Sequence, residues 1–478
     1  MSVARNYVYN TVLQITNILV PFITVPYLSR VLGPDGIGIV AFSGSIVQYF
    51  ILFGVLGLTL YGNRSIAYAG ANIEERSRVF WELVILKFIT TSTALLAFYL
   101  FVQVTSPENS SVYFVQGLLI IAAAADISWL FMGMEDFKKT VTISLFIKLL
   151  GASLIFILVK SSEDFVLYAL IGAGTTLFGQ LIMWAYIPKY IKRVMLRSLK
   201  LGRHLRGTVK LFIPTIAIEV YVVLDKTMVG LISNAAEVGI YEMSQRLVKI
   251  ALSLVTSMGV VMIPRISAIV ARKDSELLDS YAERSFHFAT YGSVFVASMI
   301  FGITPEFVPL FFGEAFLKST DVIRIMVPIV VFIAWSNVLG MQLMVPMKLE
   351  RRLTLSVSVG AMINFPLNLI LIPFLGAIGA AISSVVAEFS VTMSQLFLMR
   401  KEVHIKKLFS ASWKHVLSGA VALVSVRAVA LAPLYRSVLV ILELLTGTIV
   451  YFIVESVLGT EISKSIAARL RSLFRHYR

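Results

Sequence analysis

The chain is 478 residues long, with 58% apolar and 14% charged residues, whereas about 25% of the residues in soluble domains are charged. This composition excludes a soluble protein. The net charge of +15 would suggest a nucleic-acid partner in a soluble chain, but here the cations lie beside apolar segments and indicate anionic membrane lipids. The chain has no cysteine, which excludes disulfides, iron–sulfur clusters and thiolate zinc sites, and we expect no metal and no cofactor.

Apolar segments long enough to cross a bilayer recur along the whole chain. Because a membrane helix needs about 20 apolar residues, we predict an all-α polytopic membrane protein with about fourteen transmembrane helices. Proline and glycine mark the breaks, as at Gly33–Pro34 and at Pro373–Gly376. The predicted spans are 7–31, 38–62, 79–103, 112–134, 140–159, 164–187, 208–232, 237–263, 284–303, 319–346, 352–374, 377–399, 414–432 and 435–458.

The basic residues predict the orientation of these spans. Lys and Arg collect on the cytoplasmic side of membrane proteins. With a cytoplasmic N-terminus, 31 of them lie in inside segments and 4 in outside segments. We therefore expect a multi-pass protein with both termini in the cytoplasm.

Two basic segments also have an apolar face. Residues 189–200 and the tail at 460–478 each place cations on one side of a helix and apolar side chains on the other. This pattern predicts helices that lie on the anionic inner leaflet. We interpret both as topology determinants and surface anchors rather than as ligand sites.

An internal repeat predicts two lobes. The stretch GIGIVAFSGSIV, from Gly36, is similar to EVGIYEMSQRLV, from Glu237, at an offset of 201 residues. An even number of spans in each copy would relate two pseudo-symmetric six-helix lobes by an axis along the membrane normal. The expected divisions are an N-lobe at 1–188, a basic cytoplasmic loop at 189–207, a C-lobe at 208–400, two further spans at 401–459 and a basic tail at 460–478.

Charged residues inside the spans are candidates for function, because each costs about 2.5 to 3.5 kcal/mol at a helix centre unless it meets a partner or water. Glu219 and Lys226 share one face of the seventh span, and Glu242, Arg246 and Lys249 form a stripe on the eighth. Two interpretations stay open for this stripe. It is either an intrahelical ion pair that shields two charges or a cationic surface that binds phosphate.

Other polar residues in the spans allow similar alternatives. Asp126 is either a coupling-ion site or, as we prefer, a structural acid bonded near Ser128 and Trp129 or to a partner such as Lys148. Asp225 is a further candidate for ion coupling or charge pairing. Polar residues on one face of the first span fit either a cavity lining or contacts between helices, and they are Asn10, Gln14 and Asn17.

Several stretches of the chain resemble a known family. They include VPYLSRVLGPDGIGIVAFSGSIVQYFILFGVLGLTLYGNRSIA, DISWLFMGMEDFKKT and GAMINFPLNLILIPFLGAIGAAISSVVAE. From Asn6 to about Arg400 the sequence resembles bacterial polysaccharide repeat-unit flippases for O-antigen, capsule or exopolysaccharide. These form the Wzx-like branch of the multidrug/oligosaccharidyl-lipid/polysaccharide (MOP) exporter superfamily. Met132 stands where relatives often have glutamine.

The resemblance implies two six-span lobes that form a V in the bacterial cytoplasmic membrane, plus two C-terminal spans. It implies that the protein flips an oligosaccharide unit on undecaprenyl diphosphate from the inner to the outer leaflet by alternating access. Polysaccharide polymerase and export machinery are candidate partners besides the lipid-linked substrate. The cations that the resemblance places in cavity-lining helices are Arg30, Arg64, Lys226, Arg246 and Lys249.

Two other functions fit parts of the sequence. A cation-coupled drug antiporter of the same superfamily should have a cavity rich in acids rather than cations. A membrane glycan polymerase or ligase needs a catalytic face outside the membrane, and the longest outer segment, about Thr304 to Lys318, is too short for one. No phosphate-binding G-x-x-x-x-G-K-[ST] motif occurs. We therefore expect a transporter without catalytic residues.

Overall fold

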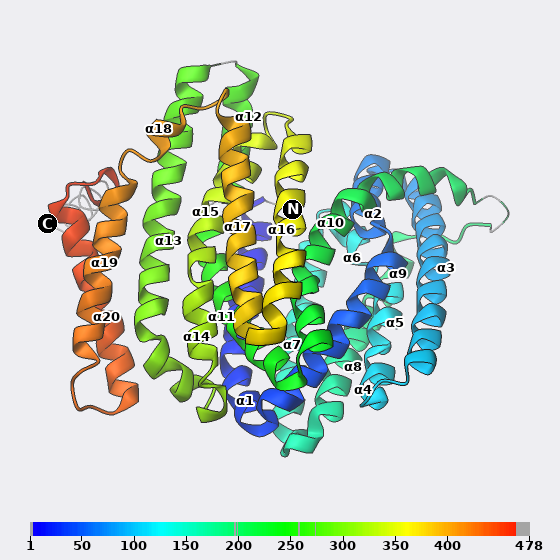
Figure 1. The fold of residues 1–478 in the computed structure, drawn as a ribbon. Coiled ribbons are helices and arrows are strands. Elements are labelled where there is room, and N and C mark those ends of the chain that lie inside the picture. The colour runs from blue at the N-terminus through cyan, green and yellow to red at the C-terminus, as the bar shows by residue number, and fades with distance from the viewer. Residues whose placement is uncertain (1–2, 196, 198, 257–258, 273, 465–478) are drawn as a thin grey trace, which may run out of the picture. The chain divides into compact units, whose positions relative to one another are not determined.

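The computed structural model describes residues 3–195, 197, 199–256, 259–272 and 274–464, and this part of the chain is helical and contains no β-strand (Figure 1). Ten of the described segments are long and apolar enough to cross a membrane by length and composition. These segments confirm the predicted all-α membrane class. The first of them, Ile15–Ala69, contains two predicted spans. The predicted spans 208–232, 237–263 and 414–432 lie on helices that are more polar and fall outside this set.

The chain divides into two compact units, Met1–Gly239 and Ile240–Arg478. The first unit thus also includes the helix that the sequence places at the start of the second lobe. Its helices are α1 (Val3–Val55), α2 (Leu58–Ala69), α3 (Ile73–Thr105), α4 (Ser110–Gln116), α5 (Leu118–Ala125), α6 (Ser128–Gly133), α7 (Phe137–Leu158), the short η1 (Ser162–Asp164), α8 (Phe165–Trp184), α9 (Ile187–Tyr190) and α10 (Gly202–Ile232).

The second unit begins within α11 (Ala235–Thr256). Its long central helix α13 carries two prolines near its end, and a π-helical segment, η4, follows α15. In chain order, the helices after α11 are α12 (Gly259–Ala271), α13 (Ser275–Phe311), η3 (Glu314–Phe316), α14 (Ser319–Met326), α15 (Pro328–Ser336), η4 (Asn337–Met344), α16 (Glu350–Leu375), α17 (Ala377–Met399), α18 (Ile405–Leu408), α19 (Ser412–Val429) and α20 (Arg436–Val457).

Glycines with positive φ make the predicted helix breaks. Gly33 has φ 67° and ψ −178° and bends α1 sharply just before Pro34. Gly376 has φ 58° and separates α16 from α17. Because residues other than glycine are strained in this region of φ, both breaks follow from the local sequence, and both predictions are confirmed.

The segment between α9 and α10 differs from the prediction, because residues 191–195 are not helical. Side chains of α3 bind its main chain instead. The Lys192 N–H donates to Ser77 Oγ (2.9 Å), and the Lys192 carbonyl accepts from Trp81 Nε1 (3.1 Å). These bonds satisfy the extended main chain, so the expected interfacial helix does not form there. The similar helix expected in the tail lies mostly in residues 465–478, outside the described part of the chain.

Matching positions of the two repeat copies have the same local geometry. Ser43 and Ser244 are both fully buried. Each hydroxyl donates to the carbonyl four residues back, to Ile39 (2.8 Å) and to Ile240 (2.7 Å) respectively. The shared burial and the shared hydrogen bond support the internal repeat that the sequence predicts.

Two repeat-related glycines make a close helix crossing within the first unit. A methyl group on Gly38 would overlap the Ala235 carbonyl oxygen, and one on Gly239 would overlap the Pro34 carbonyl oxygen. Since Ala235 and Pro34 are themselves related by the repeat offset, the contact is reciprocal. Small residues let helix backbones approach closely in membranes, and here the main chains touch directly.

Large apolar side chains cover much of the outer surface. On α3, Phe88 is 63% exposed and Leu96 is 60% exposed, while the opposite face of the same helix buries Phe80 and Leu83 against Trp129. Exposed apolar area on this scale is unfavourable in water. It indicates that lipid surrounds these helices.

Candidate functional site

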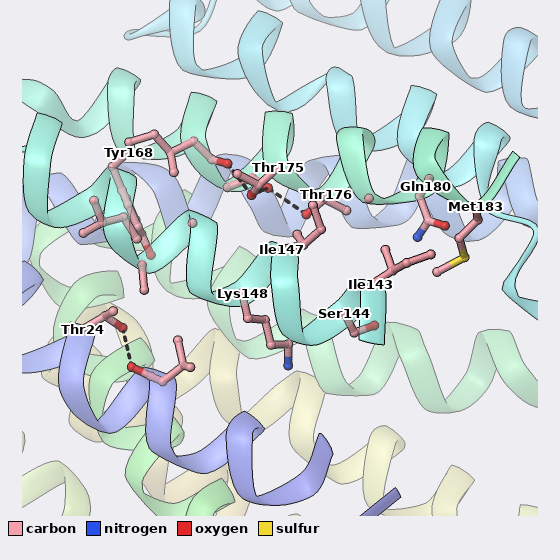
Figure 2. Close-up of a pocket in the computed structure, with 17 residues that line it drawn as sticks. Thr24, Ile143, Ser144, Ile147, Lys148, Tyr168, Thr175, Thr176, Gln180 and Met183 are labelled. Atoms are coloured by element: carbon pink, nitrogen blue, oxygen red, sulfur yellow. Dashed lines mark hydrogen bonds between the residues drawn. The ribbon is translucent and has the colours of Figure 1, made fainter. Parts of the chain in front are cut away.

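A mainly apolar pocket with a few polar side chains lies in the first unit between α1, α7 and α8, with a volume of about 370 Å³. Figure 2 shows the Lys148 side chain extending from α7 toward α1. Lys148 is the one charged side chain among the described residues that line the pocket. Ionisable residues at membrane depth usually face a cavity or a partner and mark transport pathways, so this pocket is the candidate functional site.

The wall of the pocket combines apolar groups with oxygen atoms that can accept hydrogen bonds. Thr175 donates its hydroxyl hydrogen to Ile171 O (2.6 Å) and Thr176 to Gly172 O (2.7 Å). A hydroxyl that has donated to its own helix still has lone pairs for a ligand. Gln180 Oε1 is buried and has no hydrogen-bond partner in the described structure.

Lys148 binds the amide oxygen of Asn17, which lies on α1. Asn17 supplies a dipole but no negative charge, and no carboxylate lines the pocket among the described residues. The pocket is therefore cationic, and an anionic or hydroxyl-rich ligand suits it better than a cation. The sequence placed Asn17 in a polar stripe with two neighbours whose side chains lie outside the described part of the structure.

Asp126 has a different partner from the one suggested by the sequence. The ammonium group of Lys87, which is 2% exposed, lies 3.3 Å from Asp126 Oδ2 and 2.8 Å from the Asp126 carbonyl oxygen. Asp126 Oδ1 accepts from the Ser128 N–H (2.9 Å), and its carbonyl accepts from Trp129 Nε1 (3.1 Å). The bonds to Ser128 and Trp129 are the ones that the structural interpretation expects. Lys148 is not its partner, because Asp126 lies at the break between α5 and α6, facing α3.

The charged residues of α10 lie in the first unit. Asp225 is buried, whereas Glu219 and Lys226 are partly exposed. Between Asp225 and the end of the helix, Thr227 donates to Ser45 Oγ (3.0 Å) and contacts the Tyr49 hydroxyl (3.2 Å), both on α1. These contacts tie α10 to α1 through polar side chains.

The charged stripe on α11 lies in the second unit. Arg246 Nε donates to Glu242 Oε1 at 2.7 Å, one helical turn away. The intrahelical ion pair is thus formed. The Arg246 side chain remains 38% exposed, and Lys249 is exposed one turn further along.

The two remaining predicted cations are exposed and lie outside the Lys148 pocket. Arg30, beside the bend in α1, donates to the Pro26 carbonyl (2.7 Å). Arg64, on α2, donates to the Tyr68 hydroxyl (3.1 Å), and its guanidinium lies 5.3 Å from the centre of the Tyr68 ring. The described lining of the pocket contains Lys148 and none of the five cations predicted to bind substrate.

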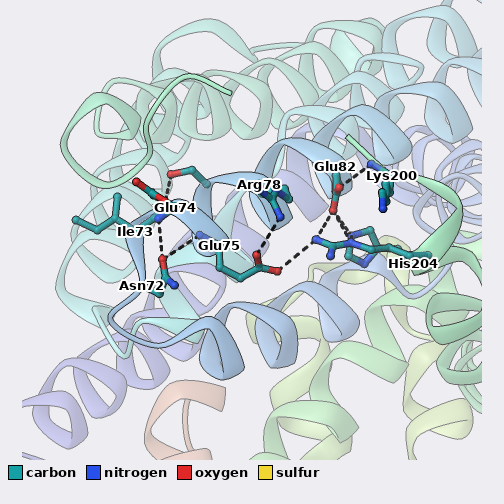
Figure 3. A network of polar contacts seen from close by, with 10 residues as sticks. Asn72, Ile73, Glu74, Glu75, Arg78, Glu82, Lys200 and His204 are labelled. Carbon is teal, nitrogen blue, oxygen red and sulfur yellow. Dashed lines mark hydrogen bonds and ion pairs between the residues drawn. The ribbon is translucent and has the colours of Figure 1, made fainter. Parts of the chain in front are cut away.

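Glu82 forms a charged centre that the sequence analysis missed. It lies on α3, is fully buried, and accepts from the Lys200 N–H (2.7 Å), from Arg203 Nε (2.8 Å) and from His204 Nε2 (2.7 Å) (Figure 3). On its other side, His204 Nδ1 contacts the Tyr61 hydroxyl (3.1 Å). The only sequence signal was an acid just inside a predicted span, because its partners lie about 120 residues away in the chain.

His204 lies in the first turn of α10, ahead of the predicted span 208–232. Burial lowers the pKa of His204 below its ordinary value of 6.5, although the hydrogen bond to Glu82 opposes that effect. The neutral ring can donate from Nε2 to the carboxylate and accept at Nδ1 from Tyr61. The Glu82 centre therefore fastens residues 200–204, which lead into α10, to α3.

Comparison with known sequences identifies relatives. A profile of the family described as "Polysaccharide biosynthesis protein" matches residues 3–270. A protein of Escherichia coli (strain K12) named "Putative O-antigen transporter" is 25% identical over 405 residues, which cover 84% of this chain and 97% of the relative. A protein of the same name from Shigella dysenteriae is 26% identical over 385 residues, which cover 80% of this chain and 96% of the relative.

Solved structures share the fold. "Lipid II flippase MurJ, inward closed conformation" matches with a TM-score of 0.76 at 13% identity, over 95% of this chain and 98% of that one. An inward-facing multidrug resistance MATE family transporter of the MOP superfamily matches with a TM-score of 0.61 at 14% identity, over 82% and 96%. These relatives are named as transporters and flippases, in agreement with an expected protein that is not an enzyme. Because the family profile covers more than half of its length, the chain belongs to the polysaccharide biosynthesis protein family.

Proposed function

We propose that the protein is a flippase. It takes an oligosaccharide repeat unit on undecaprenyl diphosphate from the inner leaflet of the bacterial cytoplasmic membrane and releases it at the outer leaflet by alternating access. The observation that carries this proposal is the cationic pocket around Lys148, halfway along a membrane helix of a polysaccharide biosynthesis protein. The names of the O-antigen transporters and of the Lipid II flippase support it.

The chemistry of the pocket matches parts of such a substrate. A glycan presents many hydroxyl groups, and a diphosphate or an acidic sugar presents negative charge. Lys148 supplies a charge-assisted donor, and Thr175, Thr176 and Gln180 supply oxygen acceptors beside apolar walls. We assign the glycan part of the substrate to this pocket.

We assign the carrier diphosphate to the cations of α11. Arg246 is held by Glu242 and exposes part of its guanidinium, and Lys249 lies one turn away on the same face. A guanidinium offers several N–H donors in a planar fork, so it can bind a carboxylate and a phosphate at once. Arg30, Arg64 and Lys226 are further proposed contacts for the substrate along its path.

The antiporter alternative draws on the likeness to MATE transporters, but a drug cation needs acidic side chains. The described lining of the Lys148 pocket holds a lysine and no acid, and Asp126 is occupied by Lys87. Glu219 and Asp225 on α10 remain candidates for ion coupling. The MurJ fold also accounts for 95% of the chain and the MATE fold for 82%, which favours a flippase.

The proposal places the protein in the inner membrane with both termini in the cytoplasm. Anionic lipids would bind the basic segments there, and polysaccharide polymerase and export machinery would receive the flipped unit. The same arrangement follows from the distribution of Lys and Arg between alternate loops.

A deletion strain tests this function. Without the flippase, the cell should make the lipid-linked unit and leave it on the inner leaflet, so surface polysaccharide falls while the intermediate accumulates. Sequestered carrier lipid should slow growth, and deletion of the first sugar transferase should restore it. Sensitivity to toxic cations should not change.

Complementation with the intact gene is the positive control, and complementation with Lys148→Met at matched membrane abundance tests the pocket. Normal surface glycan in the deletion strain, with no second flippase present, would refute the function. Altered cation sensitivity with unchanged glycan would support the antiporter instead.

A further inference from the structure

A second group of charged residues lies in the second unit, far along the sequence from Arg246, where α13, α19 and α20 pack together. The helices approach closely at glycines: a methyl group on Gly447 of α20 would come within 2.6 Å of Val426 Cγ2 and 2.7 Å of Met299 Sδ. Tyr451 and Ala422 complete this apolar core. Charged groups set into such a core have few ways to be solvated.

Three charged side chains meet beside this core, where Arg427 is 38% exposed, Glu306 is 13% exposed and Glu443 is fully buried. Arg427 of α19 donates from Nη1 to both oxygens of Glu306 on α13, at 2.8 and 3.1 Å, and to the Gly302 carbonyl at 3.0 Å. The same Nη1 atom lies 3.9 Å from Oε1 of Glu443 on α20. Two carboxyl groups therefore lie against one guanidinium nitrogen.

The two carboxyl groups are not equivalent. Glu306 takes the hydrogen bonds from Arg427, whereas Glu443 is fully buried and neither of its oxygens has a hydrogen-bond partner in the described structure. A buried carboxylate without hydrogen bonds is strongly disfavoured. By contrast, Glu455 on the same helix is equally buried but accepts from His415 Nδ1 and from Thr460 Oγ1, both at 2.8 Å.

The surrounding charges do not supply the missing cation. Arg324, on the neighbouring α14, interacts with Glu306 and with Asp321 of its own helix. Its Nε donates to the Phe301 carbonyl (3.3 Å), and its guanidinium lies 5.0 Å from the centre of the Phe301 ring. Arg324 and Arg427 are thus two cations beside the three carboxyl groups of Asp321, Glu306 and Glu443, which leaves one negative charge uncompensated when all three are ionised.

We propose that Glu443 binds a proton at neutral pH, beside the carboxyl group of Glu306. The proton comes from solvent and converts the Glu443 carboxylate to a carboxylic acid, which can donate a hydrogen bond to the Glu306 carboxylate. The site then holds one negative and one positive charge. Burial and a like charge nearby both disfavour the ionised form of a carboxyl group such as that of Glu443. This site stands apart from the Lys148 pocket and does not depend on the proposed substrate.

Infrared spectroscopy of the full-length protein in lipid nanodiscs tests the proton site. Spectra recorded from about pH 5 to about pH 9, where such groups titrate, should show a protonated carboxyl band at neutral pH that shifts in D₂O. Glu443→Gln should abolish the band. Glu306→Gln should abolish it too, because it leaves one carboxylate for one guanidinium, and it covers the case in which Glu443→Gln does not fold.

Glu455→Gln is the matched control, since it removes an equally buried but fully bonded carboxyl group, and it should leave the band intact. Absence of a protonated carboxyl band in the wild-type protein, or its persistence in both Glu306→Gln and Glu443→Gln, would overturn the proposal. Thermal stabilisation by sodium over choline that is lost in Glu443→Gln, with no such band, would assign the site to a metal cation and overturn it as well.

Discussion

The Glu82 centre and the Lys148 pocket both place a charge among the helices of the first unit, but Glu82 is fully buried and Lys148 only partly. Glu82 accepts hydrogen bonds from three residues that lead into α10, and these bonds use both of its carboxylate oxygens. Lys148 binds one amide oxygen and faces a cavity of about 370 Å³. A position among these helices therefore does not by itself separate structural charges from functional ones. The number of partners and the adjoining volume do separate them.

The largest effect is expected from removing the Glu82 carboxylate, because both of its oxygens accept hydrogen bonds. Glu82→Ala leaves the Lys200 N–H and the side chains of Arg203 and His204 without their acceptor. We expect a loss of about 2 to 3 kcal/mol in the free energy of unfolding. Thermal unfolding of the purified protein measures it.

Glu75→Ala is the matched control for Glu82, because Glu75 lies on the same helix, is 40% exposed and also contacts Arg203 (3.4 Å). An exposed ion pair is worth about 0 to 1 kcal/mol. Equal losses of stability in the two variants would contradict the structural role of Glu82.

Removing the pocket charge should instead reduce transport. Lys148→Met keeps the length of the side chain and loses a charge-assisted contact worth about 1.5 to 3 kcal/mol, so transport should fall about tenfold or more at limiting substrate. Stability should stay the same or rise, since a partly buried charge is gone. Lys148→Arg should retain part of the activity.

Lys139, on the same helix, is the contrast to Lys148. It binds Asp136 and the Tyr190 hydroxyl, so Lys139→Met should lower stability while each folded molecule still transports. If Lys148→Met lowered stability and left transport per molecule unchanged, the distinction between Lys148 and Lys139 would fail.

A smaller loss of transport is expected on α11. Arg246→Ala should reduce transport about tenfold at most, because the guanidinium is 38% exposed and solvent weakens its contact to phosphate. Arg246→Lys should recover part of it, since the charge survives and the planar fork does not. Glu242→Gln removes the intrahelical partner but keeps the cation. Transport that responds equally to Arg246→Ala and Glu242→Gln would indicate that the ion pair is only structural.

The smallest effect concerns pH and the Glu82 centre. Because burial lowers the pKa of His204, the unfolded chain takes up a proton near pH 6.5 that the folded chain does not. The free energy of unfolding keeps its full value above about pH 6.5 and falls as the pH drops from there through the folded pKa. The loss is about 1.4 kcal/mol for each unit by which the folded and unfolded pKa values differ. His204→Gln should flatten this part of the stability profile. A profile identical to that of the wild type would show that His204 does not titrate on unfolding.

Local features of the fold could be predicted from the sequence. The bend at Gly33 and the break at Gly376 follow from glycine and proline, and most helices follow from apolar runs. The repeat predicted the equivalence of Ser43 and Ser244, which share burial and hydrogen bonding. These features depend on residues within a few positions of one another.

Long-range pairings could not be predicted in the same way. Asp126 could have met any membrane lysine, and only the packing of α3 against the α5–α6 break selects Lys87 over Lys148. The basic segment after α9 has an amphipathic pattern, yet hydrogen bonds between its main chain and the side chains of Ser77 and Trp81 hold it in a non-helical conformation. Helical periodicity describes one face of one segment and says nothing about which distant segment lies opposite.

The crossing of Gly38 and Gly239 has a mechanical consequence. Main-chain atoms of the two repeat copies come into contact there because neither glycine has a Cβ atom. Elsewhere in the first unit, large side chains such as Trp129 and Phe80 pack between the helices and keep their main chains apart. Even alanine at either glycine would place a methyl group within 2.0 Å of a main-chain carbonyl oxygen and would force the two helices apart.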